Sequence, residues 1–583
     1  MNLTQEINNN LKNKDNKNEL LVKGIPSSPG LVLGRAVVVE PQPFFVISEL
    51  ISSDEIDKEI ERIDIAFDLF ADEIKSLIKK SKSTNRNIIN LLESNLYIIE
   101  DKFLIDSIKN QIKEGLSAEM ALVEEFDTQK QYLLKSHDSL IRERSIEFDQ
   151  IKQRLISILR NQKTAMKAGK GSILICQSIT PAEVIKLHEV GVVGIITEIG
   201  GISSHSAILA RSFDIAQVIG VKDITSQIET GDFVIIDGNT GIIQVNPGED
   251  SLQTFTSKKK KEKEYKNVLG KLIKLPSVTT DGKAITLRAN INFPEDIELM
   301  QTVGAEGTGL VRTEHLVIQA GKFPSLEEQF QWYDEIAHQC YPNPVTLRIF
   351  DIGSDKIAEG LSVHENNPAL GLRGIRFLLQ RKDIMLTQIN AILQASKLKN
   401  VRILLPMVST IEELEQSLVL IEECKSNLKN QGIQFDDMIP IGVMIETPGA
   451  ALIADELADK CQFFSIGTND LTQYTLAADR TNELISHHFD SFHPSVLRLI
   501  FLTIESAKRN NIKVSICGEM AGHAASTSLL IGMGVDEFSV VPSTLLEIKK
   551  RIREVSVSDS VKLASEVLST KSISEIRNKL GLI

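Results

Sequence analysis

The 583-residue sequence has little cysteine, few aromatic residues and no long apolar run, and these shortages exclude several classes of protein. Its five cysteines are odd in number and widely separated, so neither a disulfide framework nor a CxxC metal site is expected. No apolar segment approaches the roughly 20 residues that a membrane helix needs. The polar N-terminus also lacks the apolar core of a signal peptide. We therefore expect a cytoplasmic protein with no membrane contact.

Basic residues are too few for a nucleic-acid-binding protein. The chain has 65 Lys and Arg against 78 Asp and Glu, which gives a formal net charge of −13. Proteins that bind nucleic acid carry a basic footprint, so no such partner is expected. The one strong basic run, Lys258–Lys261, continues into alternating Glu and Lys, a pattern typical of a solvated linker helix.

Changes of pattern along the chain predict several domains. A polar tail covers residues 1–22, and strand-like segments occupy residues 23–42. Residues 43–165 have almost no Gly or Pro, and their apolar residues recur at three- and four-residue spacing, which predicts an all-helical domain. Short apolar strands alternate with helices over residues 166–248, so the early strands could complete one α/β domain around a helical insertion. A charged linker helix is predicted over residues 249–272.

The rest of the chain, residues 273–583, repeats a strand followed by a helix. Eight such repeats in about 310 residues fit a (β/α)8 TIM barrel, which usually has about 250 residues or more. A doubly wound sheet stays an alternative, although no GxGxxG loop follows a first strand. The runs predicted as strands are 285–290, 307–312, 345–351, 401–407, 441–446, 463–468, 513–517 and 537–540.

Polar side chains follow these runs near their carboxyl ends, where TIM barrels place their active sites. Arginine binds phosphate or carboxylate through a two-pronged guanidinium, so several arginines predict an anion with many oxygens. Paired carboxylates beside such a site, here Glu446 and Asp470, are typical of Mg²⁺ binding. A network of Arg–carboxylate salt bridges is the alternative. The polar residues at these ends are Arg288, Asn290, Arg312, Arg348, Glu446, Asn469, Asp470, Cys517 and Glu519.

Two further residues suggest group transfer. Cys517 ends a predicted strand; it is either a small buried hydrophobe or an acid able to protonate an enolate. His205 follows a strand that ends near Thr197 and a Gly200-Gly201 turn, which places it in the first turn of a helix. A phosphoryl group on that histidine would be stabilised by the helix N-terminus, whereas the alternative is a capping or packing histidine.

From about residue 23 to the end, the chain resembles the Enzyme I family of the sugar phosphotransferase system, the phosphoenolpyruvate–protein phosphotransferases. The resemblance depends on many motifs in one order and spacing, and each alone is modest. The motifs are Gly24–Gly30, Thr180–Glu183, Gly200–Arg211, Gly304–Glu314, Asp351–Lys356, Asn367–Arg373, Leu405–Val408, Gly442–Glu446, Ser465–Leu471 and Cys517–Glu519.

The resemblance implies a multidomain α/β fold, in which a swivelling phosphohistidine domain with an all-helical insertion precedes a TIM barrel. His205 would accept the phosphoryl group of phosphoenolpyruvate (PEP), and Thr180 would hydrogen-bond its ring. Cys517 would protonate the enolate to give pyruvate. The remaining implied residues are Arg312, Arg348 and Arg480 for the phosphate, Asn469 and Asp470 for the substrate, and Glu446 and Asp470 for Mg²⁺.

The resemblance also implies partners. The phosphocarrier protein HPr would dock on the insertion 43–165 and take the phosphoryl group on a histidine, as the first step of the sugar phosphotransferase system. The barrel would form a homodimer. Residues 41–160 contain 23 Asp and Glu against 17 Lys and Arg, which suits a basic partner, although ordinary solvated helix faces explain the excess equally well.

The sequence has three alternative interpretations. Pyruvate phosphate dikinases and phosphoenolpyruvate synthases are similar, but they need an ATP-grasp domain for which the sequence has no room. The nitrogen-related branch carries an N-terminal sensor domain, which a 22-residue tail cannot form. A catalytically silent regulatory protein on the same fold is the third, and the complete set of candidate residues argues against it.

Overall fold

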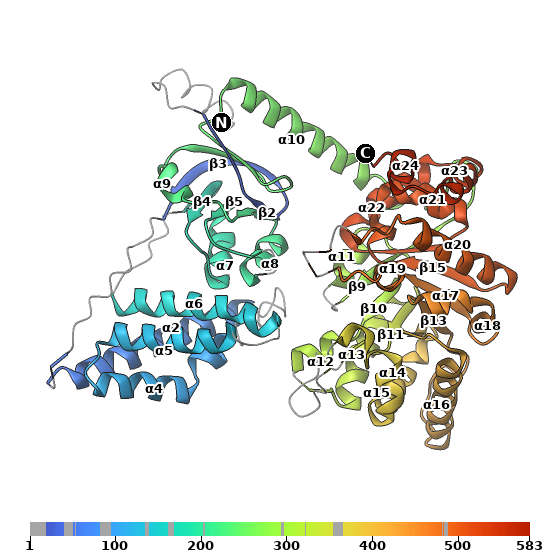
Figure 1. The fold of residues 1–583 in the computed structure, drawn as a ribbon, viewed down its shortest axis with the longest axis horizontal. Helices are drawn as coiled ribbons and strands as arrows, with labels where there is room; N and C mark the ends of the chain where they lie inside the picture. The colour runs from blue at the N-terminus through green and yellow to red at the C-terminus, as the bar shows by residue number, and fades with distance from the viewer. Residues whose placement is uncertain are drawn as a thin grey trace. The chain divides into compact units, whose positions relative to one another are not determined.

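The computed structural model describes residues 19–582 with interruptions, and its chain divides into two units, residues 1–263 and 264–583 (Figure 1). Within the described part of the chain, no helix combines the length and the apolar character that crossing a membrane requires. The segments outside the description are 1–18, 40–50, 53, 82–94, 135–138, 161–167, 202–203, 293–295, 321, 354–364, 366, 481, 483–484, 486–487 and 583.

The first unit contains an eight-stranded sheet in the order β1-β8-β7-β3-β4-β5-β6-β2. Strands β3 to β6 run parallel, whereas β1, β2, β7 and β8 pair antiparallel with their neighbours. The early strands therefore complete the α/β domain, as predicted. The strands are β1 Leu20–Lys23, β2 Ile25–Ser28, β3 Leu31–Val38, β4 Ser172–Cys176, β5 Gly194–Thr197, β6 Ala216–Ile219, β7 Phe233–Asp237 and β8 Ile242–Val245.

Strand β1 begins before the predicted end of the polar tail at residue 22. Leu20 and Val22 alternate with more exposed neighbours and pack against the core of the sheet. This two-residue alternation is the pattern of a half-buried strand, and it brings β1 alongside β8. The sheet thus takes in the last residues of the segment that we predicted as tail.

The helical insertion lies in the sequence between two parallel neighbours, β3 and β4, whose residues Val38 and Ile175 pair across the sheet. Its helices lie side by side (Figure 1) and share one hydrophobic cluster with residues of the α/β domain, including Leu174, Leu187 and Leu209. The described helices of this unit are α2 Ile56–Ser81, α4 Lys102–Lys113, α5 Ala118–Leu134, α6 Ser139–Leu159, α7 Pro181–Val190, α8 His205–Ser212 and α9 Ile224–Gln227.

Residues 249–270 form the predicted linker helix, α10 Glu249–Gly270, and the division between the two units falls inside it. Leu252 is the buried residue of this helix. Most of the residues that follow it are charged or polar, so they have little to bury. A helix without an apolar stripe gains little from packing, which agrees with a connecting role.

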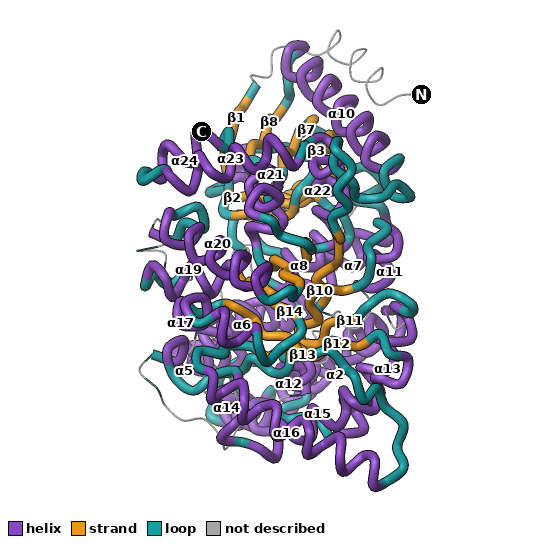
Figure 2. The backbone as a smooth tube through the Cα atoms, turned by 90° about the vertical axis from the view of Figure 1, so that its right-hand side faces the viewer, coloured by secondary structure: helices purple, strands orange, loops and turns teal. Residues whose placement is uncertain are grey.

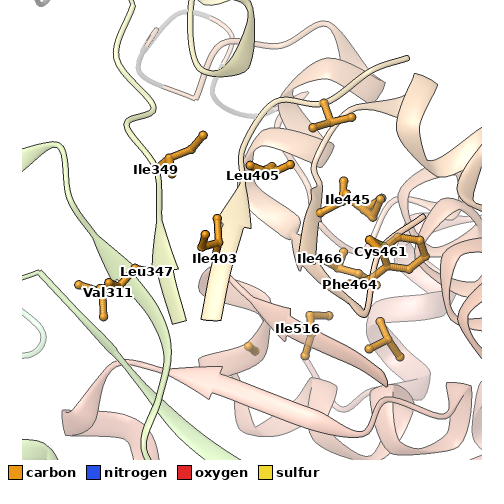
Figure 3. Close-up of a cluster of buried hydrophobic side chains, with 14 of the residues drawn as sticks. Val311, Leu347, Ile349, Ile403, Leu405, Ile445, Cys461, Phe464, Ile466 and Ile516 are labelled. Atoms are coloured by element: carbon orange, nitrogen blue, oxygen red, sulfur yellow. The ribbon is translucent and has the colours of Figure 1, made fainter. Parts of the chain in front are cut away.

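The second unit is a closed barrel of eight parallel strands in the order β9 to β16, as predicted. Figure 2 distinguishes its strands from the helices around them, and Figure 3 shows apolar side chains from several barrel strands, among them Val311, Ile403 and Ile516. The strands are β9 Thr286–Ile291, β10 Thr308–Arg312, β11 Val345–Arg348, β12 Val401–Leu405, β13 Ile441–Ile445, β14 Phe463–Gly467, β15 Lys513–Cys517 and β16 Glu537–Val540.

The barrel helices follow the strands, and many begin with a side-chain cap. Thr410, for example, closes a capping box with Glu413 at the start of α16. The helices are α11 Asp296–Thr302, α12 His315–Ala320, α13 Leu326–Cys340, α14 Ile375–Gln380, α15 Lys382–Ala395, α16 Ile411–Asn430, α17 Pro448–Leu452, α18 Ala454–Ala458, α19 Thr468–Leu476, α20 Pro494–Arg509, α21 Ala524–Met533, α22 Pro542–Glu554, α23 Val557–Ser569 and α24 Ile573–Lys579.

A buried ion pair near the amino ends of the strands corrects one expectation. Arg288 of β9 binds Glu537, the first residue of β16, through Nε–Oε2 at 2.7 Å and Nη2–Oε1 at 3.1 Å. Arg402 of β12 lies 3.7 Å from the same carboxylate. Arg288 was expected among the residues at the carboxyl ends, but its side chain belongs to this cluster.

Glu537→Gln is expected to lower the free energy of unfolding by about 3–5 kcal/mol, because it leaves the buried Arg288 without its partner charge. Urea denaturation monitored on the barrel measures the change. Asp455→Asn is the control, since Asp455 pairs with Arg509 on the surface and exposed pairs contribute little. A Gln variant as stable as the native chain would contradict the expectation.

Candidate active site

A cavity of about 330 Å³ lies at the carboxyl ends of the barrel strands. It brings together all the barrel residues that the resemblance singled out, although they are up to 205 positions apart (517 − 312) in the chain. Asn290 and Glu519 do not line it; Asn290 donates to the carbonyl of Ser539. The predicted residues in its wall are Arg312, Arg348, Glu446, Asn469, Asp470, Arg480 and Cys517.

Arg348 ends β11 and is held by two carboxylates. Its Nη2 lies 3.0 Å from Glu314 Oε1, and its Nη1 lies 3.2 Å from Asp351 Oδ2. Burial opposes the charge of this guanidinium, but Glu314, Asp351 and Glu446 outweigh burial and hold its pKa above the ordinary value. The guanidinium is therefore charged and fixed in place before any ligand arrives.

Arg373 is a fourth arginine in the cavity, and sequence reasoning gave it no role. Its Nη2 and Nε bind the two oxygens of Asp351 at 2.8 and 3.1 Å, and its Nη1 donates to Tyr474 Oη at 3.0 Å. The same Nη1 lies 3.6 Å from Asp470 Oδ1. Asp351 thus joins two arginines, Arg348 and Arg373. Asp351 and Arg373 each lie within a motif of the resemblance, and that was the only sequence signal for either residue.

Glu446 follows β13 and is 1% exposed. Burial, and then the nearby carboxylates of Asp470 and Asp351, raise its pKa to about 8. One oxygen, Oε1, accepts a hydrogen bond from the Met407 N–H at 2.7 Å. This excess of negative charge is the environment that a divalent cation would neutralise.

The carboxylates fit Mg²⁺ as a partial ligand set. Among the described residues, no group of three or more His, Cys, Asp or Glu is placed to enclose a metal ion. Mg²⁺ is usually held by one or two carboxylates together with substrate phosphate and water rather than by a full protein cage. Glu446 and Asp470 in one cavity with several arginines match that arrangement.

Met407 supports Glu446 from a backbone conformation that side chains seldom adopt, with φ +57°. Left-handed geometry at a residue other than Gly, Asn or Asp costs free energy and is concentrated at functional sites. It turns the Met407 N–H toward the Glu446 carboxylate. Sequence reasoning could not find this feature, because nothing in Leu405–Val408 marks a positive φ.

Cys517 ends β15 and is 2% exposed. Its thiol donates to the Ile466 carbonyl at 3.3 Å and accepts from Ser465 Oγ at 3.5 Å. Burial raises the pKa of the thiol to about 11, against smaller lowering effects of Ser465 and the arginines. The sulfur therefore keeps its proton at neutral pH and can act as an acid.

Asn469 and Arg480 complete the predicted wall. Asn469 lies in the first turn of α19, and its side chain is fixed by Glu519: Nδ2 donates to Glu519 Oε1 at 3.2 Å, and Oδ1 accepts from the Glu519 N–H at 3.0 Å. The backbone N–H of Arg480 donates to Gln473 Oε1 at 3.5 Å. Both residues face the cavity without being part of the Asp351 ion-pair network.

His205 is the first residue of α8, in the position that the sequence predicted, and Ser204 caps the helix by accepting from the Ala207 N–H at 3.3 Å. The side chain of His205 is outside the described residues. Thr180 caps α7; its hydroxyl donates to Glu183 Oε2 at 2.9 Å and accepts from the Glu183 N–H at 3.3 Å. A hydrogen bond from Thr180 to the ring of His205 stays a prediction.

Three family models match the chain in succession. They are described as PEP-utilising enzyme, N-terminal, over residues 23–144; PEP-utilising enzyme, mobile domain, over residues 168–241; and PEP-utilising enzyme, PEP-binding domain, over residues 266–557. The phosphoenolpyruvate-protein phosphotransferase of Haemophilus influenzae is 35% identical over 565 residues, which cover 95% of this chain and 98% of that protein. The chain belongs to the phosphoenolpyruvate-protein phosphotransferase family.

Other members of the phosphoenolpyruvate-protein phosphotransferase family align along the same length. The protein of that name from Buchnera aphidicola subsp. Schizaphis graminum is 37% identical over 573 residues, covering 96% of this chain and 100% of its own. An NMR solution structure described as Enzyme I aligns over 42% of this chain and 99% of its own, at 28% identity and a TM-score of 0.37.

The family models divide the candidate residues of this phosphotransferase between the two units. The mobile-domain match contains His205 and Thr180, and the PEP-binding match contains the whole wall of the barrel cavity. The chain is therefore a transferase whose barrel corresponds to the PEP-binding domain of its family.

Proposed function

We propose that this chain transfers the phosphoryl group of PEP to His205, releases pyruvate, and then passes the phosphoryl group to a histidine of the phosphocarrier protein HPr. The observation that carries the proposal is the barrel cavity, where anion-binding arginines, two carboxylates and a protonated thiol share one wall. Each group matches one requirement of phosphoryl transfer from an enol phosphate: charge neutralisation, metal binding and proton donation.

The arginines bind the anionic ends of the substrate. Arg312, Arg348 and Arg480 supply guanidinium donors for the phosphate oxygens, and Asn469 adds an amide donor. The Arg348 side chain needs little reorganisation when the phosphate binds, because Glu314 and Asp351 already hold its guanidinium in place. Glu446 and Asp470 would hold Mg²⁺, which supplies further charge neutralisation at the phosphate when bound.

Cys517 completes the conversion to pyruvate. The bond between phosphorus and the enol oxygen breaks as a bond from phosphorus to a ring nitrogen of His205 forms, and the electron pair stays on the enolate. The enolate carbon then takes the proton of the Cys517 thiol, which gives pyruvate and a thiolate that regains its proton from solvent. The raised thiol pKa supports this role, since the proton is present at neutral pH.

The same proposal extends to partners and assembly. The insertion between β3 and β4 is the surface that we assign to HPr, and its excess of acidic residues suits a basic partner. A homodimer through the barrel, a cytoplasmic location and a swivelling movement of the histidine domain are further parts of the proposal. The charged helix α10 supports the movement, because few apolar contacts hold it.

Incubation with PEP and Mg²⁺ is expected to add one phosphoryl group to His205, detected by intact mass and peptide mapping, and labile in acid. His205→Ala should abolish the gain. His188→Ala is the matched control, since His188 belongs to the same domain but stacks on Phe213 at 4.2 Å. A chain that gains no phosphoryl group, or gains it elsewhere, would favour the silent regulatory interpretation instead.

A further inference from the structure

A second cavity, of about 100 Å³, lies in the first unit beside the amino terminus of α8. A water molecule needs roughly 10–15 Å³ of such space, so this cavity has room for a group of several heavy atoms. Its walls are rich in hydroxyl and amide groups, which a ligand with hydrogen-bonding oxygens would satisfy. Polar residues of its wall include Gln153, Ser178, Thr197, Ser204 and Ser206.

Thr197 carries the decisive observation. It is the last residue of β5, is 1% exposed, and its Oγ1 has no hydrogen-bond partner among the described residues. Nearly all buried hydroxyls in proteins are hydrogen-bonded, so an unpartnered hydroxyl that lines a cavity is placed to bind a group that enters it. Thr180 gives the contrast, since its hydroxyl both donates to and accepts from Glu183.

The backbone relates this cavity to His205. Ser204 and Ser206, the two neighbours of His205 in the chain, both line the cavity, and Ser204 is the N-cap of α8. The N-terminus of a helix favours an anion through its free N–H groups and its dipole. An acidic group also lines the cavity, but Asp149 is neutralised by ion pairs with Lys130 and Lys152.

We propose that this cavity holds the phosphoryl group while His205 carries it, and that the Thr197 hydroxyl donates a hydrogen bond to one of its oxygens. The proposal rests on the proposed function, which makes His205 the phosphoryl acceptor. No covalent bond changes at Thr197; it binds the transferred group between its arrival from PEP and its departure to the carrier. Ser206, 5% exposed in the same wall, is the neighbouring hydroxyl.

This assignment has a thermodynamic consequence. In the unphosphorylated chain the Thr197 hydroxyl has no hydrogen-bond partner among the described residues, so its removal leaves that state at least as stable. In the phosphorylated chain its removal breaks a hydrogen bond to a charged group. Loss of the hydroxyl therefore shifts the equilibrium between PEP with free enzyme and pyruvate with phosphorylated enzyme toward PEP.

Thr197→Val tests this directly, with the full-length chain, Mg²⁺ and a series of pyruvate-to-PEP ratios. The fraction phosphorylated on His205 is read by intact mass at equilibrium. The ratio at which half of the chains are phosphorylated is expected to fall about tenfold, the effect of losing one hydrogen bond to a charged group. Thr197→Ser keeps the hydroxyl and should retain the native ratio. Thr197→Ala removes the hydroxyl with a smaller side chain, so it should show the same fall if the Val variant fails to fold.

Thr527→Val is the matched control. Thr527 of α21 is equally buried and its Oγ1 also lacks a partner among the described residues, but it lines neither cavity. The pyruvate-to-PEP ratio at which half of the Thr527→Val chains are phosphorylated should equal that of the native chain. A native chain that never becomes phosphorylated would refute the proposed function itself.

A native ratio in Thr197→Val would overturn the inference while leaving the proposed function in place. If inorganic phosphate then raised the melting temperature of the native unphosphorylated chain but not of Thr197→Val, the cavity would bind a separate anion and not the phosphoryl group on His205.

Discussion

Cys517→Ala is expected to slow the formation of pyruvate by about 10²–10⁴-fold, the usual contribution of a positioned acid. The thiol is buried at the end of β15, in the same wall as Arg348 and Glu446, and its pKa is raised to about 11, so it holds a proton to donate. Alanine removes the proton without disturbing a strong contact, because the sulfur makes only the weak hydrogen bonds with Ser465 and Ile466.

Single-turnover measurement of pyruvate separates this role from phosphoryl transfer. Phosphorylation of His205 should persist in Cys517→Ala, because the enolate can leave and take a proton from water. Cys461→Ala is the control: this cysteine of the same barrel is buried and its pKa is raised to about 12, but it lies outside the cavity. Pyruvate formation at the native rate in Cys517→Ala would remove Cys517 as the proton donor.

Glu446→Gln is expected to abolish the Mg²⁺-dependent phosphorylation of His205. It is also expected to change how the free energy of unfolding depends on pH. The pKa of Glu446 is about 8 in the folded chain, against about 4.3 for an unperturbed glutamate. Between these values the folded state binds more protons than the unfolded state. The contribution of Glu446 to the free energy of unfolding is therefore fully present below about pH 4 and is lost as the pH rises to about 8.

The size of that loss is on the order of 5 kcal/mol, at about 1.4 kcal/mol for each unit of pKa. Urea denaturation without metal should show the decline in the native chain and a flatter profile in Glu446→Gln. Mg²⁺ added at pH 8 should restore stability to the native chain and have little effect on the variant. Glu422→Gln, on an exposed part of α16, is the control that keeps the native profile. Identical profiles in native and Glu446→Gln chains would contradict the assignment.

The sequence allowed prediction of the features that depend on short-range pattern. Alternating strands and helices gave all eight barrel strands, with β15 and β16 at their observed bounds. Polar residues after strands also pointed to the cavity, because parallel strands in a barrel end at one face. The placement of His205 in the first turn of α8 followed from the strand end and the glycine turn before it.

Features that depend on distant segments could not be predicted. The prediction for Arg288 was wrong because its position in a strand does not reveal its partner. The side chain binds Glu537, which lies 249 residues later in the chain. Asp351 joins Arg348 and Arg373 through a geometry that only the closed barrel produces.

The Thr197 cavity illustrates the same limit in the first unit. It needs α6 of the insertion to lie against the end of β5, segments that are separated by tens of residues in the chain.

The position of the insertion between β3 and β4 has an evolutionary consequence. These strands are parallel neighbours, and two parallel strands must in any case be joined by a crossover of a dozen or more residues. The helical domain therefore replaces an obligatory connection and adds no break to the sheet. If the insertion binds the carrier, as proposed, recognition of a different carrier requires only a different crossover, and neither the pairing of Val38 with Ile175 nor helix α8 beyond it has to change.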